Sequence, residues 1–497
     1  MLSLATIVLA GLSVASSARS ASVPNTATDV AAVATEQATA TPKSPTSNVK
    51  GKVFDRFVNI MMENTDFTFA AGDPNMKLLA AQGLTLTNYY GTTHPSEPNY
   101  CAIFGGDHFG MDNDNFNQIP TNVSNIWDIL ADAGISFASY QENLPYTGFE
   151  GFQFLNSGSG ANNYVRKHNP PVLFNTNVEK QERLDVIKDF EAFRQDLAND
   201  VLPQHVFITP NMLNDAHDTG FTYGADWLYT FVQPLLNDKH FMNNTLLLIN
   251  FDEDSTYTIP NRVMSIIFSD LLPEELVGAT DDTVYTHYSC LSSVEANWDL
   301  PTLGRWDVAA NVFKWVAGIT GDEVREPQVP VGNFFLNQSY PGSFAQSLYG
   351  PMPVPNTKLE VNGRKVFKDV VEQWSGLQDC TAYDADSVVP PDGLRLPKSL
   401  PASCSTLLPT SIPTSSATTF VTSTTAAPLV CNSNNCLRQL KDARYSSSAS
   451  AFCSTYTKTV NTVPTAIPTY LGNCKSSPSA VSSACSCLLA ATPAPKA

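Results

Sequence analysis

The chain has 497 residues, of which 43% are hydrophobic and 15% are charged. This balance is typical of a folded globular protein and excludes a chain that is disordered throughout. Lys and Arg total 29 against 47 Asp and Glu, and the resulting net charge of −18 argues against nucleic acid or an anionic membrane as the main partner.

The N-terminal fifty residues carry two different patterns. An apolar run over 4–14, followed by small residues, predicts a secretory signal peptide within residues 1–21 and therefore a secreted, extracellular protein. Residues 22–50 are rich in Ala, Thr, Ser and Pro without apolar periodicity, so we expect a disordered leader there. No stretch approaches the roughly 18 apolar residues of a membrane span, so we expect no stable membrane insertion.

Strands and helices alternate from residue 55 onward. Apolar runs predict strands at 55–62, 84–90, 136–142, 205–210, 245–251 and 262–269. Helical spacing of apolar residues predicts helices at 125–133, 181–199, 224–237 and 306–319, and Pro98 suits the first turn of a further helix that begins near Ser96. Because the strands are continuously apolar, the pattern indicates an α/β domain of three layers, with a largely parallel sheet and helices on both faces.

The C-terminal part changes in composition. The α/β domain is expected to span residues 51–400, and a Ser/Thr/Pro-rich linker follows at 401–430. Six cysteines within 431–490 predict a small disulfide-rich module, for which 15 pairings are open.

Other cysteines and three glycosylation motifs lie outside that module. Cys101 could pair with Cys290 and Cys380 with Cys404, and the alternative for Cys101 is a buried free thiol. If the chain is secreted, N-linked glycans are expected at the three sequons, which begin at Asn122, Asn243 and Asn337.

Four polar clusters directly follow predicted strands. They are MMENTDF (61–67), THPSEPNY (93–100), TPNMLNDAHD (209–218) and NFDEDST (250–256). Ligands of an open parallel sheet bind outside the carboxyl ends of its strands. We therefore expect these clusters to meet at one rim of the sheet.

The rim is rich in hard oxygen donors. Glu63, Asn64, Asp252 and Glu253 suit Mg²⁺, Ca²⁺ or Mn²⁺ better than a thiolate-seeking metal. Adjacent carboxylates behind a buried strand repel each other unless a cation lies between them. The alternative is a solvated acidic turn at 252–254.

Ser96 and several histidines are the candidate reactive groups. Near a helix N-terminus, backbone N–H groups favour an anion such as a phosphoryl group, although Ser96 could equally be only an N-cap. Histidines near strand ends are more often structural than catalytic. The acid–base candidates are Asp215, His217, His94, His168 and His287.

Taken together, these motifs resemble the fungal secreted acid phosphatases of the phosphoesterase family. That family also contains bacterial phospholipase C-type enzymes, and it is similar in core to the alkaline phosphatase superfamily. The matching stretches span roughly 55–308, and they are NIMMENTDF, THPSEPNYCAIFGGDHFGMDND, YVRKHNPPVLF, TPNMLNDAHD, FDEDST and YTHYSCLSSVEANWDLPTLGRWD.

The resemblance implies a role for each site residue. Ser96 would be the nucleophile that accepts the phosphoryl group, and Asn99 would donate to a phosphoryl oxygen. His168 and His217 would line the phosphate pocket, with Asp215 in support. The implied ligands of a divalent metal are Glu63, Asn64, Asp252 and Glu253. The implied reaction is hydrolysis of small-molecule phosphate monoesters at acidic pH through a phosphoserine.

Two other functions remain open. A phospholipase C-type phosphodiesterase would use the same core, but no amphipathic basic helix or apolar lid is evident, so a soluble monoester is favoured. A non-catalytic cell-wall protein would instead act through its linker and cysteine module, and that module could associate an active enzyme with the cell wall.

Overall fold

The computed structural model describes residues 25–156, 158–347 and 349–391, together with Phe452, Cys453, Val481, Cys485 and Leu488. The chain divides into two compact units, Met1–Leu408 and Pro409–Ala497. Within the described part of the second unit, Cys453 forms a disulfide with Cys485, which supports in part the prediction of a disulfide-rich module. The predicted signal peptide, the whole of the predicted linker and most of the predicted module lie outside the described residues.

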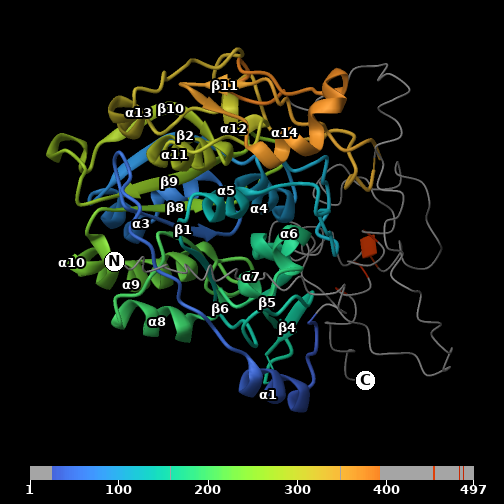
Figure 1. The fold of residues 1–497 in the computed structure, drawn as a ribbon. Coiled ribbons are helices and arrows are strands. Elements are labelled where there is room, and N and C mark those ends of the chain that lie inside the picture. Colours follow the sequence, from blue (N-terminus) through green and yellow to red (C-terminus); the bar gives the residue numbers. More distant parts are fainter. Residues whose placement is uncertain are drawn as a thin grey trace, which may run out of the picture. The chain divides into compact units, whose positions relative to one another are not determined.

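An eight-stranded sheet forms the centre of the first unit (Figure 1). Its strand order is β10-β2-β9-β8-β1-β7-β3-β6. All the pairs are parallel except those of β9, which runs antiparallel to both β2 and β8. The strands are β1 Arg56–Met62, β2 Leu84–Tyr90, β3 Phe137–Gln141, β6 Ile187–Lys188, β7 His205–Thr209, β8 Thr245–Phe251, β9 Arg262–Phe268 and β10 Thr280–Thr286.

Every residue of β7 and β8 is buried, because the sheet is covered on both faces. In Figure 1, α4, α5 and α11 lie on one side of the sheet and α8, α9 and α10 on the other. The α/β class with a largely parallel sheet is thus confirmed. Two small antiparallel pairs lie outside this sheet, namely β4 Gln153–Leu155 with β5 Asn162–Val165, and β11 Glu360–Val361 with β12 Arg364–Lys365.

The helices are mostly short. The α-helices are α1 Val30–Thr39, α2 Phe67–Gly72, α3 Pro74–Ala80, α4 Ser96–Gly105, α5 Ile126–Asp132, α6 Asn175–Val178, α7 Gln181–Leu184, α8 Phe190–Ala198, α9 Phe221–Asn237, α10 Lys239–Met242, α11 Tyr288–Trp298, α12 Trp306–Ala309, α13 Lys314–Thr320 and α14 Lys368–Trp374. The 3₁₀ helices are η1 Arg166–His168, η2 Pro170–Leu173, η3 Glu274–Leu276 and η4 Ser375–Cys380. No helix within the described residues is both long and apolar enough to cross a membrane.

Residues 25–50 are not the disordered leader that their composition suggested. They carry α1, and the segment after it lies against the larger domain. Lys43 donates its backbone N–H to the carbonyl of Asp185 at 2.9 Å, and Ser44 Oγ donates to Asp196 Oδ1 at 2.6 Å. The side chains of Ser44 and Ser47 pair here with buried Asp196 and Gln204 of the domain, and composition alone does not reveal such partners.

Two expected helices are each divided in the structure. The 181–199 helix breaks because Ile187 and Lys188 pair with β3 as the edge strand β6, and Asp189 then caps α8 by accepting a hydrogen bond from Ala192 N at 2.8 Å. The 306–319 helix is likewise divided into α12 and α13.

The cysteine pairing proposed between two helices of the domain is absent. Cys101 and Cys290 are both buried free thiols. Cys101 Sγ donates to the carbonyl of Asp107 at 3.4 Å. Cys380 is disulfide-bonded, but its expected partner Cys404 lies outside the described residues.

Candidate active site

The four polar clusters meet at the carboxyl ends of the strands. Glu63 follows β1 and its N–H donates to the carbonyl of Asp215, which follows β7, at 3.0 Å. Asp252 follows β8 and its N–H donates to the carbonyl of Met62 at 3.1 Å. The neighbouring Thr65 N–H donates to the carbonyl of Glu253 at 3.2 Å. Groups nearly 200 residues apart therefore share one rim, as the sheet order requires.

Ser96 begins helix α4, which starts in the loop after β2. The N-cap residue is Pro95, and no side chain of that residue caps the helix. Ser96 is therefore the first helical residue and not an N-cap. Its Oγ is buried, 3.2 Å from Glu63 Oε2 and 3.5 Å from Glu253 Oε1. Pro98 fits the same first turn because the N–H it lacks would have no partner inside the helix.

Asn99 fixes the loop before Ser96. Its Oδ1 accepts from the N–H groups of Thr92 at 2.7 Å and Thr93 at 3.3 Å. Its Nδ2 donates to the carbonyls of Thr93 at 2.8 Å and Pro95 at 3.2 Å. Donation to a phosphoryl oxygen, the role that the resemblance implied, would break one of these bonds.

His168 bridges two acidic groups of the rim. Its Nε2 lies 2.8 Å from Glu63 Oε1 and its Nδ1 lies 3.4 Å from Asp215 Oδ2. Burial alone would raise the pKa of Glu63, but the positive charges of His168 and Lys167 hold that pKa well below its ordinary value. Burial would lower the pKa of His168, and Glu63 more than offsets this, so the pKa is raised. The two groups form a buried ion pair.

The pKa of Asp215 is shifted in the opposite direction from that of Glu63. Burial raises the pKa of the Asp215 carboxyl to about 7, and the hydrogen bond and charge of His168 only partly offset the rise. Its Oδ1 accepts from the backbone N–H of His217 at 2.7 Å. Asp215 therefore supports both histidines. His217 itself is held at Nδ1 by Asp218 Oδ1 at 2.7 Å, which leaves Nε2 facing the rim.

The acidic pair after β8 is buried. Both side-chain oxygens of Asp252 lack a hydrogen-bond partner. Burial, followed by the charges of Glu63 and Glu253, raises the pKa of Asp252 well above its usual range. Glu253 Oε2 contacts His94 Nδ1, and the imidazole of His94 stacks on Tyr257 with ring centroids 3.7 Å apart. The solvated-turn alternative for this acidic stretch is therefore excluded.

These donors fit a hard divalent cation. Within the part of the chain that the structure describes, no three His, Cys, Asp or Glu side chains already converge as a metal-ligand set. The fit depends instead on Asp252, whose two buried oxygens have no hydrogen-bond partner, and on Glu63, whose negative charge helps to raise the pKa of Asp252. Two such carboxylates gain most from a positive charge between them. Asn64 follows Glu63 on the same rim and could complete the oxygen set.

Two residues at the rim, Lys167 and His94, were not predicted as site residues from the sequence. Lys167 was not singled out, although its Nζ lies 3.2 Å from Ser96 Oγ. It adjoins His168 in the quoted YVRKHNPP stretch, and a lysine beside so acidic a rim was the available signal. His94 was discounted, yet it pairs with Glu253. His287 is buried and its Nε2 contacts the carbonyl of Asp252 at 2.6 Å; burial lowers its pKa to about 4, so it is a neutral structural partner.

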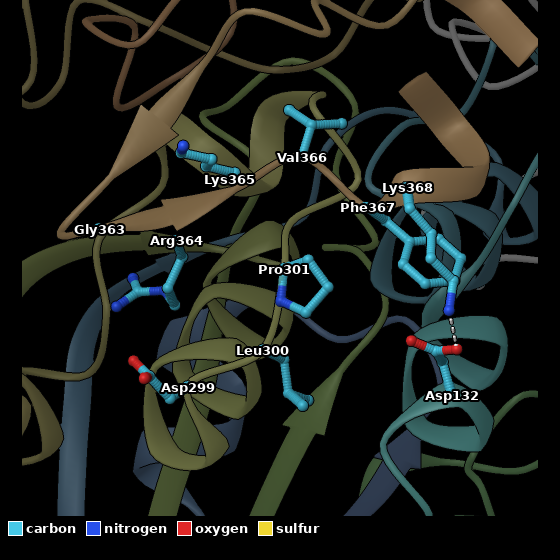
Figure 2. A pocket seen from close by; sticks show the side chains of 10 residues that line it. All are labelled: Asp132, Asp299, Leu300, Pro301, Gly363, Arg364, Lys365, Val366, Phe367 and Lys368. Carbon is cyan, nitrogen blue, oxygen red and sulfur yellow. Dashed lines mark hydrogen bonds and ion pairs between the residues drawn. The ribbon is translucent and has the colours of Figure 1, made fainter. Parts of the chain in front are cut away.

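A separate pocket lies away from this rim. It has a volume of about 360 Å³ and is lined by Asp132, Asp299, Leu300, Pro301 and residues 363–368 (Figure 2). Asp299 follows the C-terminal end of α11, whereas His287 beside Asp252 precedes the first residue of that 11-residue helix. Most of its charged side chains form ion pairs: Lys368 with Asp132, Arg364 with Asp322, and Asp299 with Lys52. The pocket is therefore distinct from the candidate active site.

Comparisons with known proteins identify the family of the chain. Residues 15–301 match the model of the phosphoesterase family. The acid phosphatase of Aspergillus fumigatus is 48% identical over 73% of this chain and 81% of its own length. The phosphate-repressible acid phosphatase of Penicillium chrysogenum is 50% identical over 72% of this chain and 85% of its own length. The chain belongs to the phosphoesterase family. Within that family it is of the fungal acid phosphatase type, a phosphoric monoester hydrolase.

More distant proteins were also found. The phosphatidylinositol-3-phosphatase of Mycobacterium tuberculosis is 31% identical over 50% of this chain and 79% of its own length. The phosphonate monoester hydrolase of Agrobacterium radiobacter aligns in structure over 55% of this chain and 78% of its own, with 11% identity and a TM-score of 0.33. At that score the structural likeness adds nothing to the fold defined by the sheet itself.

Proposed function

We propose that the protein is a secreted acid phosphatase that hydrolyses phosphate monoesters through a phosphoserine at Ser96, with the help of a divalent metal ion. The observation that carries the proposal is the surroundings of Ser96 Oγ, which lies 3.2 Å from both the Glu63 carboxylate and the Lys167 ammonium. A hydroxyl that donates to a carboxylate and accepts from an ammonium is polarised toward the alkoxide. The names of the fungal relatives support a monoester substrate.

The first step is in-line attack by Ser96 Oγ on phosphorus. The hydroxyl hydrogen has two carboxylate acceptors in reach, Glu63 at 3.2 Å and Glu253 at 3.5 Å. Ser96 stands at the N-terminus of α4, where the dipole of the helix favours the incoming anion. Asn99 keeps the loop before Ser96 in one conformation, so little ordering is needed when substrate binds.

A divalent ion held by Glu63, Asn64, Asp252 and Glu253 would lower the pKa of the serine hydroxyl and offset the charge of the transferring phosphoryl group. His217, fixed at Nδ1 by Asp218, would donate a proton from Nε2 to the leaving alkoxide. The same nitrogen would then accept a proton from the water that hydrolyses the phosphoserine. His168 holds Glu63 in place and keeps it ionised.

Secretion is proposed from the apolar run at 4–14 and from the disulfide between Cys453 and Cys485, which fits an oxidising compartment. Association of the C-terminal module with the cell wall remains a hypothesis of the same kind. Localising the full-length chain and a chain that ends at residue 400 would test both.

The activity is tested with p-nitrophenyl phosphate and bis-(p-nitrophenyl) phosphate across acidic to alkaline pH. We expect monoester hydrolysis by the wild type, loss of several orders of magnitude in Ser96→Ala, and reversible loss with a chelator. Cleavage of the diester alone would favour the phosphodiesterase alternative. Full activity in Ser96→Ala would contradict the phosphoserine.

A further inference from the structure

We propose that Lys167 is a catalytic residue that stabilises the developing alkoxide of Ser96, and that Asp114 positions it. The inference rests on the proposed function, because it assigns a role in the step that forms the phosphoserine. Neither residue was among the predicted site residues.

The ammonium group of Lys167 is surrounded by acceptors. Its Nζ lies 3.2 Å from Ser96 Oγ, 3.2 Å from Asp114 Oδ2 and 3.4 Å from His217 Nε2. A lysine ammonium has three N–H donors and no acceptor, so acceptors from three different segments fix its position; the bond to His217 Nε2 forms only while that nitrogen carries no proton. The side chain is only 13% exposed, which strengthens its electrostatic interactions relative to those at the surface.

Residues on either side of Lys167 fix the backbone that carries it. Arg166, Lys167 and His168 together form η1. Arg166 is buried and donates to the carbonyls of Glu150 at 2.9 Å and Asn117 at 3.2 Å. His168 on the other side is ion-paired with Glu63. A lysine side chain loses rotamer entropy when it is held in one position, and a fixed backbone on both sides leaves only that side chain to be ordered.

The direction of the hydrogen bonds gives the ammonium its role. Ser96 Oγ donates its hydrogen to Glu63, so the bond from Lys167 must reach a lone pair of the same oxygen. The positive charge therefore faces the atom that becomes negative when the proton leaves. A donor placed where charge develops in the transition state contributes to the rate and not only to binding.

Asp114 links the lysine to the helix of the nucleophile. Its Oδ1 accepts from the backbone N–H of Glu97 at 3.0 Å, in the first turn of α4, while its Oδ2 pairs with Lys167. Pro95 supplies no capping side chain, so this carboxylate from a different loop does so instead. Asp114 thereby fixes the position of Lys167 relative to the helix that begins at Ser96.

The test measures phosphoserine formation directly. Full-length wild type, Lys167→Gln and Asp114→Asn are mixed with p-nitrophenyl phosphate, quenched in acid at short times, and the Ser96 peptide is quantified by mass spectrometry. Lys77→Gln, an exposed lysine on α3, is the matched control for loss of one positive charge. We expect formation to slow on the order of 10²–10³-fold in Lys167→Gln, roughly tenfold in Asp114→Asn, and not at all in Lys77→Gln.

Chemical rescue separates catalysis from structural ion pairing. Ethylammonium ions should restore part of the rate of phosphoserine formation in Lys167→Ala, because they return a cation to the vacated space. Formation at the wild-type rate in Lys167→Gln would overturn the inference, as would slow formation without rescue in a variant with a lowered melting temperature. If wild type hydrolyses substrate without any Ser96 adduct, the proposed function fails instead, and that failure is visible without any lysine variant.

Discussion

At the scale of single residues, Asp252 has the least favourable surroundings of the proposed metal ligands. Its buried carboxylate has no hydrogen-bond partner and lies beside Glu63 and Glu253, which both raise its pKa. A group so placed costs folding free energy unless a cation compensates it. Without a bound cation, Asp252 therefore lowers the stability of the fold, and the same property makes it a suitable ligand for a cation.

Replacing Asp252 by Asn should separate stability from function. In the presence of a chelator, we expect Asp252→Asn to melt a few degrees higher than wild type, because a buried unpaired carboxylate is removed. Phosphatase activity with metal should fall by at least about 10²-fold. Thermal denaturation with and without chelator measures the first effect. The exposed Asp282→Asn serves as control, and an equal melting temperature for both variants and wild type would contradict the argument.

The hydrogen bonds of Asn337 predict whether its sequon carries a glycan. Its Nδ2 donates to the carbonyls of Tyr257 at 3.0 Å and Ile259 at 2.6 Å, and its Oδ1 contacts His94 Nε2 at 3.1 Å. An N-linked glycan replaces one amide hydrogen and would break a bond. We therefore expect protein from a secretory host to carry no glycan at Asn337.

Peptide mapping after enzymatic deglycosylation in oxygen-18-labelled water tests this expectation. The exposed sequons at Asn122 and Asn243 are the internal controls. Full glycan occupancy at Asn337 would show that its bonds near His94 do not form before glycosylation.

At the scale of elements, the segment before β1 is part of the folded domain. Lys188 Nζ donates to the carbonyl of Lys43 at 2.8 Å and contacts Asp196, which also accepts from Ser44. Gln204 Oε1 accepts from Ser47 Oγ at 2.6 Å. Removal of this segment would expose a buried ion pair that it now covers.

Deletion of residues 22–48 should therefore destabilise the domain. A hydrogen bond to a charged group typically contributes about 1.5–3 kcal/mol, and the deletion removes such bonds from Lys188 and Asp196, so we expect a clearly lower denaturant midpoint and faster proteolysis near Lys188. Chemical denaturation of the truncated and full-length proteins measures this. Deletion of residues 401–497 is the comparison. An unchanged midpoint after the first deletion would restore the disordered-leader prediction.

At the scale of the whole molecule, burial of carboxyl groups favours an acidic environment. Glu295 on α11 is buried with both oxygens unpartnered. Burial, and then the charge of Asp307, raises the pKa of Glu295 well above its usual value. Burial likewise raises the pKa of Asp254 to about 9. Folded states that hold these protons lose stability as pH rises above about 4, where the unfolded chain releases them. The net charge of −18 adds repulsion in the same direction.

The buried His205 acts in the opposite sense. Burial lowers the pKa of His205 to about 3, whereas the unfolded side chain titrates near about 6.5. The unfolded state thus binds more protons between these values, and His205 lowers stability as pH falls through that window. The carboxyls and His205 together place the pH of greatest stability in the mildly acidic range.

Replacing Glu295 by Gln should flatten the loss of stability at high pH. Gln is neutral throughout, so Glu295→Gln should match wild type near pH 4 and exceed its free energy of unfolding progressively toward pH 8. Denaturant titrations at several pH values measure this. The exposed Glu372→Gln is the control. A constant difference between Glu295→Gln and wild type across pH would exclude proton binding as the cause.

Much of this molecule was determined by local patterns that the sequence displays. Continuous apolar runs specify buried strands, because only a sheet covered on both faces makes them favourable. Polar clusters directly after those runs specify the rim, since parallel strands share their carboxyl edge. Ser96 at the start of a helix followed from Pro98 alone.

The tertiary structure decided what depends on partners distant in the chain. It divided 181–199 because β3 offered an edge to Ile187 and Lys188, and it ordered residues 25–50 against buried polar groups. It also brought Lys167 to Ser96, 71 residues away. Such contacts leave no periodicity in the sequence. A long flexible side chain has no fixed direction until three segments supply its acceptors, and only the folded sheet brings those segments together.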